Sequence, residues 1–139
     1  MSKKIRKMVI EDYEKIFELW SKTKGIGLSE ADSKENIPSF LKRNEGLSFV
    51  CEVDGVIIGA ILCGYDGRRG YIHHLVVHEE HRKKGIGNEL VSKCLEKLKS
   101  KGITKCHLFI FCDNEIGISF WNKTGWVKRD DIFIFSKKI

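Results

Sequence analysis

The N-terminal third of the chain alternates between one strand-like segment and two helix-like segments. Residues 4–10 predict a first strand. Glu11 and Asp12 then open a helix that ends at 25–27, and its apolar face carries, at helical spacing, Tyr13, Ile16, Phe17 and Trp20. A second, shorter helix is predicted over about 33–43, with Ile37, Phe40 and Leu41 turned inward.

The middle of the chain predicts a meander of three strands. In residues 47–53, Leu47, Phe49, Cys51 and Val53 alternate with more polar neighbours, as in a half-buried strand. Asp54-Gly55 is a strong signal for a two-residue hairpin turn. The almost continuously apolar run 56–63 fits a strand covered on both faces, and the turn 66–70 leads into a strand over 71–77.

The last third predicts helix, strand, helix and strand. A long helix spans 86 to about 101, closed by Gly102, with one apolar stripe made of Ile86, Leu90, Val91, Cys94, Leu95 and Leu98. Residues 106–112 predict a buried strand, 114–124 a short helix, and 126–137 one or two final strands. The order of elements predicts an α/β fold: a mixed, mostly antiparallel sheet with helices on both faces.

The composition narrows the class of protein to which this sequence can belong. The 139 residues predict one domain over 1–139. With 42% hydrophobic and 32% charged residues, general disorder is excluded. No apolar run approaches the about 20 residues of a membrane span, and the lysine-rich start lacks the apolar segment of a signal peptide. We therefore expect a cytoplasmic protein with no membrane partner.

The five cysteines all fall within apolar stretches, and no two have Cys-x-x-Cys spacing. We expect buried, reduced thiols that act as small apolar side chains, and no structural zinc or other metal.

The net charge of +6 suits nucleic acid, anionic membranes and phosphate-bearing ligands alike. Most of the basic residues are scattered, and nothing resembles a DNA-reading helix, so we do not expect nucleic acid as a partner. One cluster, Arg82-Lys83-Lys84, stands apart because two glycines and a long helix come directly after it.

The segment 78–88 connects an apolar strand directly to the start of the long amphipathic helix. Such a junction offers unpaired backbone N–H groups and the positive end of the helix dipole to an anion. Gly85 and Gly87 allow the backbone to approach phosphate oxygens closely, and the basic cluster adds charged donors. A surface loop with capping glycines is the simpler interpretation. The preceding strand, the long helix and the three bases favour a phosphate site.

The type of phosphate site is narrowed by comparing motifs. No Walker string is present, and the third glycine of a dinucleotide fingerprint is replaced by Leu90. Arg-x-x-Gly-x-Gly after a Leu-Val-Val strand resembles the acetyl-CoA loop of the GNAT acetyltransferase superfamily. The resemblance covers nearly the whole chain, including 74–77 and 114–126. Segments 64–75 and 120–131 resemble a YpeA-like bacterial and archaeal branch.

The resemblance implies a GNAT fold that binds acetyl-CoA as co-substrate. The pyrophosphate would lie on the backbone N–H groups of Lys83, Lys84, Gly85, Ile86, Gly87 and Asn88, with Arg82 beside them. The pantetheine arm would pair like an extra strand with Leu75, Val76 and Val77, at an edge opened by a bulge, and an N–H near Leu75 would polarise the thioester carbonyl. Asn114 matches a position that contacts the cofactor in relatives; a plain helix N-cap explains it equally well.

The resemblance breaks at the residue that often protonates the leaving thiolate. Many relatives have a tyrosine where this chain has Trp121, and an indole N–H cannot transfer a proton near neutral pH. Trp121 would then shape the cofactor or acceptor channel and donate at most a hydrogen bond. Tyr71, His73 and His74 are candidate substitutes, and strict alternation predicts Tyr71 and His73 on one face of the strand and His74 on the other. The thiolate also leaves readily without a specific acid.

The sequence leaves the acceptor open. An acidic rim of Glu30, Asp32, Glu35 and the 129–131 segment would attract a cationic amine, whereas helix capping explains the first group as well. We expect a primary amine on a small molecule, a protein or a peptide, with a homodimer as one option. A longer acyl-CoA donor, a non-catalytic CoA-binding regulatory module and a nucleic-acid-binding domain are the alternatives.

Overall fold

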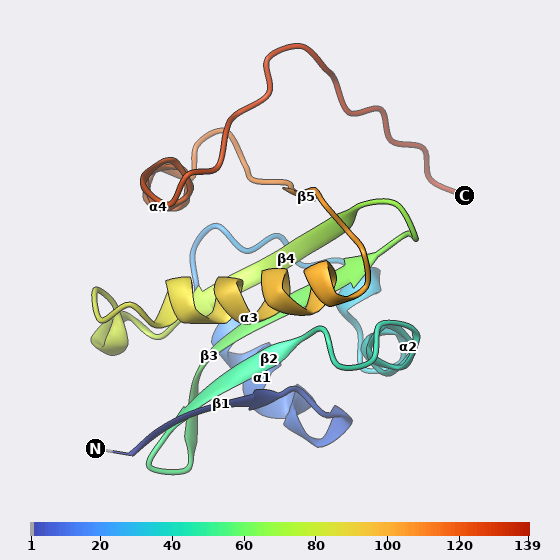
Figure 1. Cartoon of the computed structure of the whole chain (residues 1–139). Coiled ribbons are helices and arrows are strands. Elements are labelled where there is room, and N and C mark those ends of the chain that lie inside the picture. The colour runs from blue at the N-terminus through green and yellow to red at the C-terminus, as the bar shows by residue number, and fades with distance from the viewer. Residues whose placement is uncertain (1) are drawn as a thin grey trace. The chain divides into compact units, whose positions relative to one another are not determined.

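The computed structural model describes residues 2–139 and contains one five-stranded sheet in the order β1-β2-β3-β4-β5 (Figure 1). The strands are β1 (Lys3–Lys7), β2 (Phe49–Val53), β3 (Val56–Tyr65), β4 (Gly70–Val77) and β5 (Cys106–Leu108). Neighbours pair antiparallel except β4 and β5, which pair parallel. The predicted mixed, mostly antiparallel sheet is confirmed.

The helices are α1 (Tyr13–Ser21), α2 (Asn36–Arg43), α3 (Ile86–Ser100) and α4 (Glu115–Lys123), with the 3-10 turns η1 (Ile10–Asp12), η2 (Glu30–Asp32) and η3 (Glu79–His81). The chain divides into two compact units, 1–109 and 110–139, and each is described by itself. The first holds the sheet and α1 to α3, and the second holds α4. A single domain over 1–139 stays a prediction.

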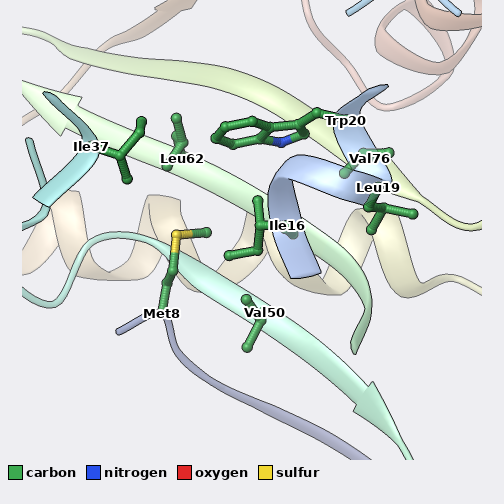
Figure 2. Close-up of a cluster of buried hydrophobic side chains, with 9 residues drawn as sticks. Met8, Ile16, Leu19, Trp20, Ile37, Val50, Leu62 and Val76 are labelled. Atoms are coloured by element: carbon green, nitrogen blue, oxygen red, sulfur yellow. The ribbon is translucent and has the colours of Figure 1, made fainter. Parts of the chain in front are cut away.

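One face of the sheet packs on α1 and α2. Trp20 and Ile16 of α1 and Ile37 of α2 meet strand residues that include Leu62 and Val76 in one buried cluster (Figure 2). Trp20 is only 1% exposed. The predicted inward face of α1 is thus confirmed at Ile16 and Trp20, whereas Phe17 remains 37% exposed.

The opposite face packs on α3. The stripe predicted for this helix is buried, apart from Leu95, which is 38% exposed. The helix lies so close to the sheet that a Cβ on Gly70 would come within 2.5 Å of Cδ1 of Leu98, and a Cβ on Gly59 within 3.3 Å of Cδ1 of Leu90. The absence of a side chain at Gly70 therefore allows α3 to pack this close to β4.

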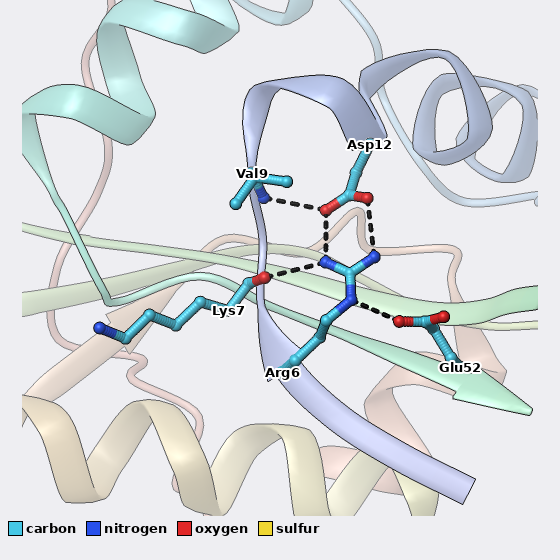
Figure 3. Close-up of polar contacts among 5 residues, drawn as sticks. All are labelled: Arg6, Lys7, Val9, Asp12 and Glu52. Carbon is cyan, nitrogen blue, oxygen red and sulfur yellow. Dashed lines mark hydrogen bonds and ion pairs between the residues drawn. The ribbon is translucent and has the colours of Figure 1, made fainter. Parts of the chain in front are cut away.

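An ion-pair network ties β1 to the start of α1. Nη1 and Nη2 of Arg6 donate to the Asp12 carboxylate at 2.8 and 2.9 Å, and Nε of Arg6 donates to Glu52 on β2 (Figure 3). The same Asp12 carboxylate accepts the Val9 N–H at 2.9 Å. Burial acts to raise the pKa of Asp12, but these bonds outweigh it and hold the pKa below its usual value.

The predicted hairpin between β2 and β3 is confirmed. Asp54 and Gly55 both adopt positive φ, 50° and 81°, as a two-residue turn of the primed type requires.

The prediction of strands over 126–137 is wrong, and so is the prediction of a strand extending over 106–112. Residues 126–137 form no strand, and β5 ends at Leu108. Phe133 and Phe135 are 91% and 94% exposed. A β-prone sequence becomes a strand only where a neighbouring strand accepts its hydrogen bonds, and no strand within residues 2–139 pairs with this segment.

The burial of the cysteines is confirmed only in part. Cys51, Cys63 and Cys94 are buried free thiols, whereas Cys106 is half-buried and Cys112 is exposed. Cys106 begins an edge strand, and Cys112 lies beyond the shortened β5, so apolar sequence neighbours do not cover either one fully.

Candidate functional site

The outer edge of β4 is open over half its length. Pairing with β5 covers only Gly70, Tyr71 and Ile72, and no other strand in residues 2–139 pairs with β4 on that side. The edge from His73 to Val77 is therefore available to an extended ligand. Of the residues expected here, Leu75 and Val77 are half-buried, and Val76 is 2% exposed with its side chain in the α1 cluster. Only the backbone of Val76 can face a ligand.

The open edge leads directly into the loop before α3. Nε of Arg82 donates to the carbonyl of Val77 at 2.9 Å, which ties the loop back to the strand end. Arg82, Lys83 and Lys84 are all exposed. The three basic side chains precede α3 in the chain, and none of them forms an ion pair with a described residue.

The first turn of α3 has the features of an anion-binding helix start. Gly85, the N-cap, has φ 81° and open space where a Cβ would be, and no side chain caps the helix. The N–H groups of the first turn consequently lack a capping side chain. Asn88 is exposed and Gly87 is half-buried, whereas the side chain of Ile86 is 3% exposed and belongs to the core. Ile86 can contribute only its backbone.

A β-bulge in β4 overturns the predicted placement of His74. Leu62 pairs with His73 and Ala60 with Val76, so two β4 residues oppose one β3 residue, and His74 has φ 51°. His73 lies against Phe40 of α2, with ring centroids 6.1 Å apart, and His74 lies against Trp20 of α1, 5.0 Å apart. Both imidazoles therefore occupy the α1/α2 side of the sheet. The extra residue cancels the alternation of the strand.

The two histidines have different surroundings. Nε2 of His74 lies 2.8 Å from Oδ1 of Asp32 in η2. Burial, followed by the neighbouring His74, lowers the pKa of His73, and Asp32 acts in the opposite direction. These surroundings favour the neutral form of His73.

Tyr71 belongs to an aromatic group at the paired end of β4. Its ring lies 5.9 Å from that of His107, its register partner on β5, and 6.3 Å from that of Phe109. Sequence reasoning missed His107, since its place opposite Tyr71 depends on the parallel register of β4 and β5.

Asp32 does not belong to the predicted acidic rim. Asp32 is 6% exposed and accepts the Ser29 N–H at 3.0 Å, so it caps η2 and pairs with His74 instead of facing a ligand. Glu30 and Glu35 are exposed. In the 110–139 unit, Arg129 pairs with Asp131 at 2.8 Å.

The second unit contains the two remaining predicted residues. Oδ1 of Asn114 accepts the Gly117 N–H at 3.0 Å, which establishes Asn114 as the N-cap of α4. The Trp121 ring is half-buried between Phe120 and Trp126, with centroids 4.9 Å from each. Trp121 is thus part of an aromatic trio.

Two further kinds of feature are absent from residues 2–139. No helix there is long and apolar enough to cross a membrane. No three or more His, Cys, Asp or Glu side chains of the described chain are grouped so that they could hold a metal ion.

Comparison with known proteins gives a consistent assignment. The model of the acetyltransferase (GNAT) family matches residues 13–126. Acetyltransferases of Sodalis glossinidius and Pectobacterium atrosepticum are 32% and 33% identical over 129 residues, which is 93% of this chain and 90% and 91% of theirs.

Solved structures share the fold. The PaiA N-acetyltransferase of Thermoplasma acidophilum, in complex with coenzyme A, aligns with a TM-score of 0.78 at 29% identity, covering 90% of this chain and 89% of that one. Ard1 of Thermoplasma volcanium aligns with a TM-score of 0.80 at 21% identity, over 91% and 84% of the two chains. The open β4 edge, the uncapped start of α3 and these matches agree, and the chain belongs to the GNAT family of acetyltransferases.

Proposed function

We propose that the protein transfers the acetyl group of acetyl-CoA to a primary amine by direct attack within a ternary complex. One observation carries this proposal: the unpaired edge of β4 is followed, after one short loop, by the uncapped N-terminus of α3. An extended chain that ends in a pyrophosphate matches this sequence of backbone donors and acceptors. The PaiA relative at 29% identity is in complex with coenzyme A, which supports the same ligand here.

The residues around this path fit acetyl-CoA. Backbone N–H groups from Lys83 to Asn88 would hold the pyrophosphate, with charge-assisted bonds from Arg82. The backbone of Leu75 to Val77 would pair with the pantetheine arm. In the second unit, we assign cofactor contacts to Asn114 and Trp121 on family resemblance, beside the capping and packing roles described above.

The reaction asks three things of the protein. It must hold the amine in line with the thioester carbon, accept a proton from the amine, and allow the thiolate to leave. An N–C bond forms, the C–S bond breaks, and its electron pair leaves on sulfur. Because Trp121 cannot donate a proton near neutral pH, the thiolate would take its proton from Tyr71, His73 or His74, or directly from solvent.

The acceptor approaches, in this proposal, on the α1/α2 side of the sheet. Tyr71, His73 and His74 all lie on that side of β4. The exposed carboxylates Glu30 and Glu35 favour a cationic acceptor there. The amine belongs to a small molecule, a protein or a peptide.

Two measurements test the proposal. Calorimetry with acetyl-CoA and with a duplex oligonucleotide should show binding of acetyl-CoA alone, whereas salt-sensitive oligonucleotide binding without acetyl-CoA binding would overturn it. Thiol release should then depend on an added amine from a panel of small amines and peptides. Acetyl-CoA binding without release for any amine would favour a CoA-binding regulatory module, the interpretation that Trp121 in place of tyrosine supports.

A further inference from the structure

The carboxylate of Asp32 is held on several sides. Oδ2 accepts the Ser29 N–H at 3.0 Å, as in a capping box, and Oδ1 lies 2.8 Å from Nε2 of His74. The backbone carbonyl of Asp32 accepts the Tyr13 hydroxyl at 2.8 Å. The side chain of Asp32 is 9% exposed. Its position is therefore fixed by η2 and α1 together.

This arrangement decides which nitrogen of His74 is free. An ionised carboxylate only accepts hydrogen bonds, so Nε2 of His74 must carry the proton that lies between them. In the neutral ring, Nδ1 then has the free lone pair, and no described residue donates to it. The His74 side chain is 17% exposed, so the ring is not sealed off.

The backbone of His74 indicates that this placement is costly. A non-glycine residue with φ 51° in the middle of a strand is strained. This backbone conformation, at the bulge, places the imidazole of His74 on the α1/α2 side of the sheet, where the open edge of β4 begins. Among the described residues, neither His73, packed on Phe40, nor Tyr71, packed on His107, has a carboxylate partner.

We propose that His74 is the general base of the reaction and that Asp32 is its positioning residue. The inference rests on the proposed function. Nδ1 of His74 accepts the proton that the attacking nitrogen loses as the N–C bond forms. The C–S bond breaks and its electron pair leaves on sulfur. The resulting imidazolium charge faces the Asp32 carboxylate, which stabilises it.

Few charged or titratable groups of the described chain face this pair. Asp32 contributes the carboxylate from η2, His73 is the neighbouring imidazole on β4, and Tyr13 of α1 reaches Asp32 through its hydroxyl. Trp20, against which the ring packs, is uncharged. The carboxylate of Asp32 is therefore the group to change.

Asp32→Asn tests the proposal with little change of shape. The Ser29 N–H still needs an acceptor, so the amide oxygen stays on it and the NH₂ group turns toward Nε2 of His74. That ring nitrogen must then accept, and the proton moves to Nδ1, the position the base requires to be free. We expect kcat for amine-dependent thiol release to fall by about 100-fold or more, the usual size of a general-base contribution. The KM for the amine and the affinity for acetyl-CoA should change little.

The ring itself supplies a readout that a merely structural contact would not move. Nitrogen-15 NMR of the histidines should show His74 as the Nε2–H tautomer in the wild type and as the Nδ1–H tautomer in Asp32→Asn. His74→Asn suits the left-handed backbone and should lose a similar factor, and the double variant should lose no more than either single one. Glu45→Gln removes an exposed carboxylate between α2 and β2, away from the proposed site, and is the control that should retain kcat.

Three outcomes would overturn the inference. These are an Nδ1–H tautomer in the wild type, an unchanged kcat in Asp32→Asn, and losses that multiply in the double variant. Absence of amine-dependent thiol release from the wild type would overturn the proposed function as well, so the two failures are distinguishable.

Discussion

The guanidinium of Arg82 bonds to the carbonyl of Val77, the last residue of β4, at 2.9 Å. This contact fixes the side chain at the corner where the open strand edge meets the loop before α3. The donor used is Nε, and neither Nη group has a hydrogen-bond partner among the described residues. Arg82 is thereby positioned to donate to an anion at the helix start.

Replacing Arg82 should weaken acetyl-CoA binding. We expect Arg82→Ala to cost about 1–3 kcal/mol of binding free energy, the range for a charge-assisted hydrogen bond. Calorimetric titration with acetyl-CoA measures the difference. Arg68→Ala, in the exposed turn between β3 and β4, is the control and should bind like the wild type. Equal affinities of the two variants would place the pyrophosphate elsewhere.

Gly85 should tolerate no acidic side chain. Gly85→Glu puts a carboxylate at the helix start, where it competes with the pyrophosphate, and we expect acetyl-CoA binding to be lost. The positive φ adds about 1–2 kcal/mol of backbone strain. Gly67→Glu separates the two effects, since Gly67 also has positive φ, 97°, and open space. It should lose similar stability in urea unfolding and keep its affinity. If Gly85→Glu also binds normally, the loop is not the anion site.

The elements that sequence periodicity predicts well are those defined by local signals. The helix over 86–101 carries its own apolar stripe and a glycine at its N-cap, and the observed α3 spans Ile86–Ser100. The turn at Asp54-Gly55 is equally local. The phosphate loop belongs to the same class, because a strand, a glycine-rich loop and a helix come one after another directly along the chain.

The features that the sequence does not reveal depend on distant partners. Strict alternation placed His74 on the wrong face because a bulge leaves no mark in the hydrophobic pattern. Ser29 and Asp32 carry the spacing of a capping box, but the partner of Asp32 lies 42 residues away. The 126–137 segment has strand-forming residues and lacks a paired neighbour among the described strands. Local pattern predicts elements, whereas pairing decides which side chains the candidate site contains.

Trp121 should act through packing. Trp121→Phe keeps an aromatic ring between Phe120 and Trp126 and should retain most of the turnover. Trp121→Ala removes two edge-to-face contacts, each worth about 0.5–1.5 kcal/mol beyond the area it buries, and should lower both turnover and thermal stability. Thiol release and thermal unfolding, with Trp126→Phe as the matched control, measure the effects. Loss of turnover in Trp121→Phe with normal folding and affinity would instead point to an essential indole N–H.

The Asp12 network should make stability depend on pH in the acid range. Because the pKa of Asp12 in the folded chain lies below its ordinary value of 3.8, its contribution is complete above that pH and is lost as the pH falls through the folded-state pKa. Asp12→Asn should therefore cost about 1–3 kcal/mol at pH 7 and progressively less below pH 4. Urea unfolding of both proteins at pH 7 and pH 3 tests this. Other carboxylates titrate in both proteins and cancel in the difference, so a difference that does not shrink would contradict the assignment.

His73 should affect stability in a different pH range. Its pKa is lowered from the ordinary 6.5, chiefly by burial, so the folded protein binds fewer protons than the unfolded chain. The contribution of His73 to the free energy of unfolding is therefore complete above pH 6.5 and declines as the pH falls below that value. His73→Phe keeps a ring against Phe40 and removes the titration. The wild type should lose more stability than this variant between pH 7 and pH 5 in urea unfolding. Parallel curves for the wild type and His73→Phe would mean that His73 takes up its proton without cost, in conflict with its burial on the α2 side of the sheet.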